Sequence, residues 1–135
     1  MKTPEQIVSL MLEKDAFSEW LGVELKEIAL GKSRLKATVH EQMLNGFRLA
    51  HGGISYSLSD SALAFASNSR GNKCVSIETS ISHVRPVLEG DELDIVCEEK
   101  YRGKKIGVYE VEIRNQTGKI VSLFKGTVHI SEELW

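Results

Sequence analysis

The sequence predicts an α+β protein in which an antiparallel sheet curls around one buried helix. The segment 54–69 has helical periodicity, and Asp60 is its only charged residue. The second half alternates apolar and polar residues in several runs separated by turn signals. The 135 residues contain no repeat, low-complexity tract or linker, so a single domain over residues 1–135 is expected. A helix without a charged face is a buried one, and the sheet is the only segment expected to cover it.

The N-terminus predicts a short helical piece followed by strands. Thr3 can act as N-cap, Pro4 fits the first helical position, and Gln6 completes a capping box. A second short helical turn is expected from Asp15, carrying Trp20 and Leu21. Extended segments follow, with strict alternation at Leu35, Ala37 and Val39.

The central helix is predicted from a repeat of apolar positions at helical spacing, namely Ile54, Leu58, Ala62 and Phe65. The triplet His51-Gly52-Gly53 precedes it, and Gly71 follows as a C-terminal stop. The many Ser and Ala residues of this segment suggest that other backbone packs closely against it.

The second half predicts a meander of strands. Alternating runs cover 75–81, 93–97 and 109–113, and residues 120–130 close the sheet. Turns are expected at 89–91 and 102–104, and Asn115-Gln116-Thr117-Gly118 is a hairpin signal.

Composition excludes several functional classes. The formal charge of -2 gives no support for a nucleic-acid binder. Cys74 and Cys97 form no metal motif and no CxxC, so we expect two reduced thiols in a cytoplasmic protein. No apolar leader and no run of 18 apolar residues occurs, so neither a signal peptide nor a membrane span is expected. No Walker or Rossmann glycine pattern and no metal-ligand spacing is present, and we expect no cofactor.

Two features of the central helix carry chemistry. His51-Gly52-Gly53 places small residues at a helix N-terminus, whose free N–H groups polarise a carbonyl oxygen or hold an anion. The alternative is a tight turn into the helix. Asp60 is an acid on an otherwise uncharged helix, which costs desolvation unless the carboxylate is used or satisfied. Its alternative is a structural Asp that is hydrogen-bonded to backbone or to a serine.

The spacing of these two features favours a shared site between two chains. Gly53 and Asp60 are seven residues apart, so they lie on one helix face at a separation of roughly 10 Å. That is too far for both to touch one reacting carbon. A two-fold dimer with antiparallel helices would bring Asp60 of one chain near Gly53 of the other.

Other candidates are weaker. Asn45 can hydrogen-bond water or a substrate carbonyl, or it can be a turn residue. His51 can orient its loop, cap the helix or act as a base. The remaining histidines fall in strand patterns and are expected to be structural: His40, His83 and His129. The serines of the central helix, Ser55, Ser57, Ser59 and Ser61, do not form a nucleophile elbow. Basic residues at strand ends are candidates for contact with a phosphorylated ligand: Arg85, Lys104, Lys105 and Arg114.

The motif Asn45-(x)5-His51-Gly52-Gly53-(x)6-Asp60 resembles the hotdog-fold acyl-CoA thioesterases, most closely the phenylacetate-degradation type. The stretches 84–86, 107–109, 113–116 and 124–127 are similar too, so the resemblance covers about residues 15–130.

The resemblance implies a long helix wrapped by an antiparallel sheet, in dimers that pair into tetramers with sites at the dimer interface. It implies that Asp60 acts as general base or nucleophile. Gly53 and Gly52 would supply N–H groups to the thioester oxygen, with Asn45 and His51 beside them. Ser76 matches a position that holds a hydroxyl in some relatives, and Arg85 and Ser76 are expected to contact substrate.

The expected function is therefore hydrolysis of an acyl-CoA thioester to free acid and coenzyme A, without metal or organic cofactor. Aryl-acetyl groups such as phenylacetyl or hydroxyphenylacetyl are favoured by the resemblance. Two alternatives remain: a 3-hydroxyacyl thioester dehydratase of the same fold, and a non-catalytic acyl-CoA binding module.

Overall fold

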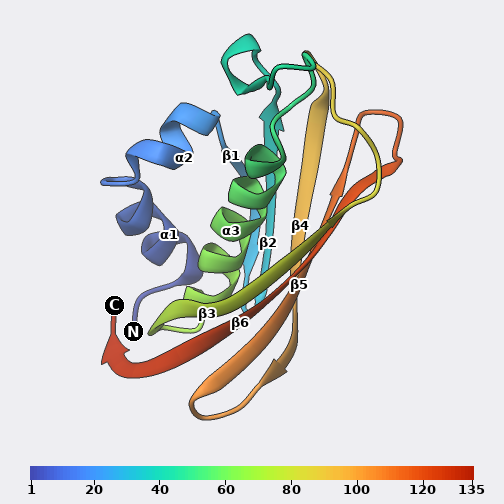
Figure 1. The fold of residues 1–135 in the computed structure, drawn as a ribbon. Coiled ribbons are helices and arrows are strands. Elements are labelled where there is room, and N and C mark those ends of the chain that lie inside the picture. The colour runs from blue at the N-terminus through green and yellow to red at the C-terminus, as the bar shows by residue number, and fades with distance from the viewer.

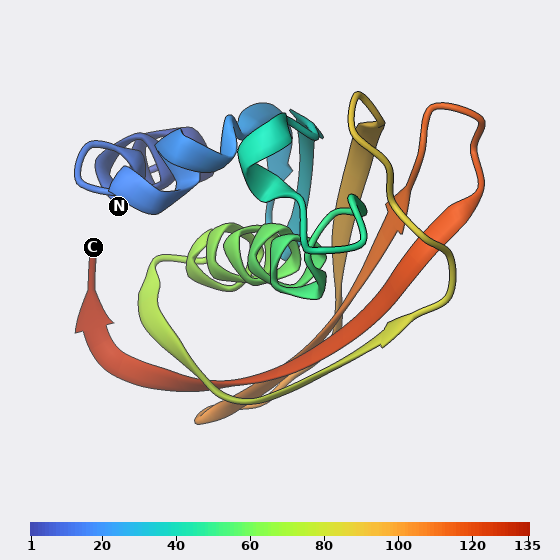
Figure 2. The same cartoon turned by 45° about the horizontal axis from the view of Figure 1, so that its top comes forward.

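The computed structural model describes all residues 1–135 and shows one six-stranded antiparallel sheet curled around a long helix, α3 (Figures 1 and 2). The strand order is β1-β2-β4-β5-β6-β3, so β1 and β3 are the edges. The helices are α1 (Pro4–Leu12), α2 (Ala16–Leu21), a short 3₁₀ turn η1 (Glu41–Met43) and α3 (Gly52–Asn68). The strands are β1 (Glu24–Ala29), β2 (Lys32–Thr38), β3 (Asn72–His83), β4 (Glu92–Arg102), β5 (Ile106–Arg114) and β6 (Ile120–Leu134). No helix is both long and apolar enough to cross a membrane.

The N-terminal helices form as the capping residues predict. The Gln6 N–H donates to Thr3 Oγ1 at 3.2 Å, and the Thr3 N–H donates to Gln6 Oε1 at 2.9 Å. Asp15 caps α2, which ends at Gly22 with φ +72°. Both helices lie on the same side of the sheet as α3 (Figure 1).

The expectation that the sheet alone covers the central helix is wrong. The hydroxyls of Ser18 on α2 and Ser61 on α3 are 2.9 Å apart, and α1 also contacts α3. Ile7, Val8 and Leu21 of the two short helices are fully buried. The curled sheet contacts only one side of α3, so the opposite side is buried by α1 and α2.

The alternation predicted for the later strands is confirmed in β4 and β5, whose inward residues pack on α3. It fails in β3, where Val75 and Ile77 are 65% and 58% exposed. β3 is an edge strand, and its register with β6 shifts between Ser76 and Glu78, which changes the face that the following residues present. Two adjacent apolar side chains are thus left uncovered in the single chain.

A cluster of charged side chains anchors the C-terminal end of α3. Arg70 donates two hydrogen bonds of 2.9 Å to the Glu99 carboxylate, and Tyr109 donates a third at 2.7 Å. Arg102 donates to Tyr109 Oη at 3.0 Å and to the Ser67 carbonyl at 3.1 Å. Burial raises the pKa of Glu99, but the hydrogen bonds from Arg70 and Tyr109 outweigh it and hold that pKa below its ordinary value. The carboxylate therefore stabilises the fold above its ordinary pKa, and this stabilisation is lost as the pH falls through the lowered value.

Tyr109→Phe should lower the free energy of unfolding by about 1–3 kcal/mol, because it removes two hydrogen bonds from a fully buried residue and leaves Glu99 and Arg102 each short of a partner. Urea denaturation at neutral pH measures the change. The exposed Tyr101 makes no hydrogen bond through its hydroxyl, so Tyr101→Phe is the matched control and should leave the midpoint in place. Equal midpoints for the two variants would contradict the anchoring role.

Candidate active site at the N-terminus of α3

The His51-Gly52-Gly53 turn is built as a helix cap. His51 is the N-cap of α3, and its Nδ1 accepts a hydrogen bond of 2.9 Å from the Gly53 N–H. The His51 N–H donates to the Met43 carbonyl at 2.8 Å, which ties the turn to η1. This hydrogen bond requires that His51 Nδ1 carries no proton.

The cap decides which helix N–H groups are free. The Gly52 N–H makes no hydrogen bond within the chain, whereas the Gly53 N–H is occupied by His51. The predicted role of Gly53 toward a thioester oxygen therefore requires His51 to release this donor when substrate binds. Gly52 offers an N–H at the positive end of the α3 dipole without any rearrangement.

His51→Ala should lower the free energy of unfolding by about 0.5–2 kcal/mol, the usual cost of losing an N-cap side chain. His51→Asn should retain most of that stability, because the Asn oxygen takes the place of Nδ1 as acceptor. Thermal denaturation of the two variants beside the parent chain measures the difference. Equal losses in both would show that the ring does more than cap the helix.

Asp60 lies two turns further along α3, half-buried, and neither carboxylate oxygen accepts a hydrogen bond or forms an ion pair within the chain. Partial burial raises its pKa above the ordinary value of an aspartate. The alternative of a structural Asp held by backbone or a serine is therefore not realised in the single chain. An acid left without a partner on a helix that carries no other charge is a candidate functional group.

A cleft of about 350 Å³ opens beside the start of α3. We call it the α3 cleft, and it is lined by Asn45, Leu49, Ala50, Gly52, Ser55, His83, Val84, Arg85, Pro86 and Val87. Backbone hydrogen bonds fix its walls: the Ala50 N–H donates to the Val87 carbonyl at 2.8 Å, and the Val84 N–H donates to the Val121 carbonyl at 3.0 Å. The cleft is therefore preformed by segments that are distant in sequence.

The α3 cleft brings together only some of the predicted site residues. Asn45, Gly52 and Arg85 line it, whereas Gly53, His51 and Asp60 do not. Asn45 is a turn residue, because its Oδ1 accepts from the N–H groups of Phe47 and Leu49 at 2.9 and 3.2 Å. Its Nδ2 makes no hydrogen bond within the chain and is available as a donor.

Four further predicted contacts lie outside the cleft. Ser76 is exposed on the edge strand β3, paired with Val128 of β6. Arg114 is held at its hairpin by Glu112 and the Gly118 carbonyl. Lys104 and Lys105 follow β4, at the end of the sheet opposite to the β3–β4 connection that carries Arg85 (Figure 1).

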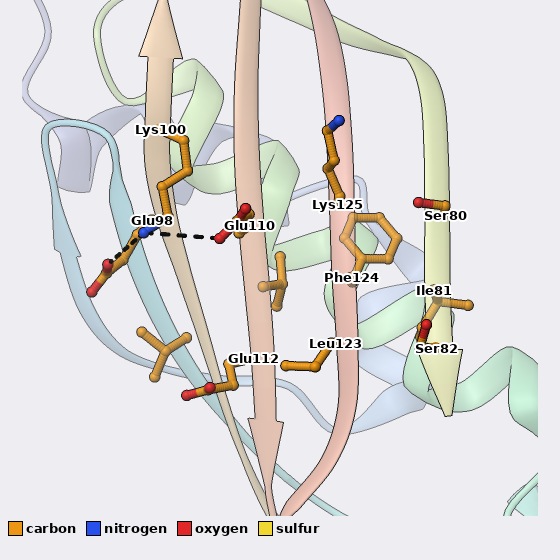
Figure 3. A pocket seen from close by; sticks show the side chains of 12 residues that line it. Ser80, Ile81, Ser82, Glu98, Lys100, Glu110, Glu112, Leu123, Phe124 and Lys125 are labelled. Carbon is orange, nitrogen blue, oxygen red and sulfur yellow. Dashed lines mark ion pairs between the residues drawn. The ribbon is translucent and has the colours of Figure 1, made fainter. Parts of the chain in front are cut away.

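A second hollow, of about 440 Å³, is separate from these residues. Figure 3 looks onto it across β3–β6, with α3 behind the strands. Lys100 lies between Glu98 and Glu110, at 3.6 and 3.9 Å from their oxygens. The acidic and basic side chains that line this hollow largely neutralise one another. No residue of the motif that joins Asn45, the His51 triplet and Asp60 lines it.

Comparison with known proteins decides the family. Residues 47–122 match the family model described as thioesterase superfamily. The chain is 40% identical to the acyl-coenzyme A thioesterase PaaI of Escherichia coli K12 over 119 residues, which are 88% of this chain and 85% of the relative. The chain belongs to the thioesterase superfamily.

Solved structures of this superfamily agree with the fold. The E. coli PaaI protein from the phenylacetic acid degradation operon superposes with a TM-score of 0.94 at 37% identity, covering 97% of this chain and 95% of that one. A hypothetical thioesterase from Streptococcus pneumoniae TIGR4 with coenzyme A superposes with a TM-score of 0.88 at 25% identity, covering 93% and 98%. The hotdog resemblance and the predicted α+β fold class are thereby confirmed.

Two residues that line the α3 cleft are not among the site residues predicted from the sequence. Ser55 does not stand in a nucleophile elbow and His83 falls in a strand pattern, yet both line the α3 cleft. His83 is the last residue of β3, and its position just before Arg85-Pro86 was the available signal. Ser55 lies three residues after Gly52 and thus on the same face of the helix.

Proposed function

We propose that this protein hydrolyses acyl-CoA thioesters to a free acid and coenzyme A, with aryl-acetyl groups such as phenylacetyl or hydroxyphenylacetyl as the expected acyl part. The observation that carries the proposal is Asp60, a partly desolvated carboxylate without any partner, two turns from a helix N-terminus that offers a free N–H. The name and operon of the E. coli relative support the choice of thioester and of acyl group.

The mechanism needs an activated carbonyl and an activated water. The thioester oxygen would lie at the N-terminus of α3, where Gly52 or Gly53 donates an N–H and the helix dipole stabilises developing negative charge. Asp60 would take a proton from water as general base, or attack the carbonyl as nucleophile. Asn45 would hold the water or the carbonyl through Nδ2, with His51 orienting the turn.

The working unit is proposed to be a two-fold dimer that shares its sites. Along α3, Gly53 and Asp60 are roughly 10 Å apart, so one chain supplies only half of a site. β3 is an edge strand whose outer side has no neighbouring strand, and it exposes Val75 and Ile77, which a second copy would cover. Pairing of such dimers into a tetramer is proposed as well, as the family resemblance implies.

Residues 1–135 are proposed to act as one thioesterase domain in the cytoplasm. Cys74 and Cys97 are both free, which agrees with the predicted thiols. No group of three or more His, Cys, Asp or Glu side chains is gathered in a way that could hold a metal ion.

A thiol-release assay tests the proposed activity. Purified protein is mixed with phenylacetyl-, hydroxyphenylacetyl-, short-, medium- and long-chain acyl-CoAs, and free coenzyme A is measured with a thiol reagent while the acid is identified by mass spectrometry. Stoichiometric thiol and acid are expected from at least one ester. Conversion of a 3-hydroxyacyl-CoA to an enoyl-CoA without thiol would indicate the dehydratase, and saturable binding without any conversion would indicate a binding module.

A further inference from the structure

A tyrosine of α3 is tied to the edge strand of the sheet one turn before Asp60. The Tyr56 and Thr79 hydroxyls are hydrogen-bonded to each other, and the Tyr56 ring meets the Phe124 ring edge to face, with 5.6 Å between the centroids. Contacts with β3 and β6 thus fix both the ring and its hydroxyl. Neither hydroxyl makes any other hydrogen bond within the chain, and Tyr56 remains 37% exposed. The side chain is therefore held in one place and is still accessible to a ligand.

The irregular register of β3 places Thr79 on the side of the sheet that faces α3. The pairing of β3 with β6 shifts between Ser76 and Glu78, and beyond this bulge Thr79 lies opposite Gly126. Gly126 faces the helix, because a methyl group added to it would lie only 2.5 Å from the Leu63 side chain of α3. Residues directly opposite each other in an antiparallel pair share a face, so Thr79 faces the helix as well. Bulges beside active sites re-aim side chains in this way.

The two hydroxyls lie beside the proposed catalytic carboxylate. Tyr56 precedes Asp60 by four residues, so their side chains are neighbours on one face of α3. Helical side chains lean toward the N-terminus of their helix, so the Asp60 carboxylate lies over the turn that carries Tyr56. Neither the sheet nor α1 and α2 cover these two residues completely. A substrate whose carbonyl is at Asp60 therefore has the Tyr56 ring within reach of its acyl part.

The two hydroxyls form a neutral group that both donates and accepts hydrogen bonds. They carry two hydrogens, and only one of these is used in the bond between Tyr56 and Thr79. The second hydrogen and the remaining lone pairs are free. A hydroxyl on the ligand suits such a group, because it also donates and accepts, whereas the negative charge of Asp60 on the next turn disfavours an anion. The Tyr56 ring adds a flat apolar surface that suits an aromatic ring.

We propose that Tyr56 and Thr79 determine the acyl specificity of this site, with the Tyr56 ring against the aromatic ring of an aryl-acetyl group and the two hydroxyls hydrogen-bonded to a hydroxyl on that ring. This inference rests on the proposed thioester hydrolysis and chooses between its two expected acyl groups, hydroxyphenylacetyl over phenylacetyl. The pantetheine arm of coenzyme A also carries amides and a hydroxyl. The experiment therefore compares esters in which that arm is identical.

The test uses pairs of esters that differ only in one ring substituent: hydroxyphenylacetyl-CoA and the methylphenylacetyl-CoA of the same ring position, for the meta and the para position. kcat/KM is measured for each ester by thiol release. The wild type should prefer the hydroxyl at one position at least. Tyr56→Phe should lower the hydroxyl-to-methyl ratio there about three- to tenfold, within the range for one neutral hydrogen bond. Thr79→Val should lower it as well, and the double variant should show no preference for the hydroxyl.

Tyr101→Phe is the matched control, because Tyr101 is an exposed tyrosine of β4 whose hydroxyl makes no hydrogen bond. It should leave the ratio unchanged. Tyr56→Phe also breaks the hydrogen bond between α3 and β3 and should lower Tm. A loss of stability alone acts equally on both esters of a pair, so a purely structural role would not change their ratio.

The outcomes separate the specificity role from the activity. No hydroxyl preference in the wild type, or an unchanged ratio in Tyr56→Phe, would overturn the role of the two hydroxyls while leaving thioester hydrolysis in place. Equal losses for both esters of a pair would show contact with a part that they share, such as the pantetheine arm, and would also overturn it. If the wild type released no thiol from any ester, the proposed function would fail instead. Calorimetric titration with the corresponding free hydroxy and methyl acids would then decide: tighter binding of the hydroxy acid that Tyr56→Phe abolishes would support the role, and equal binding would contradict it.

Discussion

Asp60→Asn should lower kcat on the best acyl-CoA by about 10²–10⁴-fold if the carboxylate is a general base, and by more if it is the nucleophile. Asn keeps the size of the side chain but cannot take a proton from water or attack a carbonyl. Since Asp60 makes no hydrogen bond within the chain, the substitution removes no structural contact. kcat is measured by thiol release, and affinity by titration with a non-hydrolysable acyl-CoA analogue, which should still bind.

The direction in which Asp60→Asn changes the folding stability follows from the pKa of Asp60. Partial burial raises the pKa of Asp60, so the charged form is disfavoured in the folded chain. The resulting penalty is absent below the ordinary pKa of an aspartate and is fully present above the raised value. Asp60→Asn should therefore leave Tm unchanged in acid and hold or raise it at neutral pH. A folded Asp60→Asn protein with near-wild-type kcat would remove Asp60 from the mechanism.

Replacing Val75 and Ile77 together by lysine should convert the protein to monomers and reduce turnover to background. The two side chains are 65% and 58% exposed on an edge strand, where a partner strand would cover them. Lysines there place like charges of two copies against each other across a two-fold axis. Sedimentation velocity measures the mass, and thiol release measures the activity of the same sample.

Leu30→Lys is the control for this change. Leu30 is also exposed, but it lies in the turn between β1 and β2, and β1 is the opposite edge of the sheet. It should alter neither mass nor turnover. A fully active monomer, from either the wild type or the double variant, would refute the shared site. In that case Asp60 and the start of α3 would have to act within one chain.

Local signals account for the elements that could be predicted. The capping box at Thr3, the apolar repeat of the central helix and the alternation in 93–97 and 109–113 each depend on neighbours within a few residues. The spacing of the His51 triplet and Asp60 likewise places both on one helix. These features could be predicted because backbone geometry itself imposes the helix and strand periods.

Longer-range contacts account for what could not be predicted. The strand order decides that β3 is an edge, and only that order leaves Val75 and Ile77 uncovered. The cover that α1 and α2 provide for α3 also depends on where separate elements pack.

The sequence by itself determined the fold class, the position of the central helix and the acid that it carries, because periodicity, capping and a single charge on an apolar helix act locally. The tertiary structure alone decided how those parts meet. It brought His83 onto Gly52 and the Tyr56 hydroxyl onto that of Thr79. The reason is physical: which polar atoms meet depends on the placement of segments that are far apart in the sequence, and no local pattern encodes that placement.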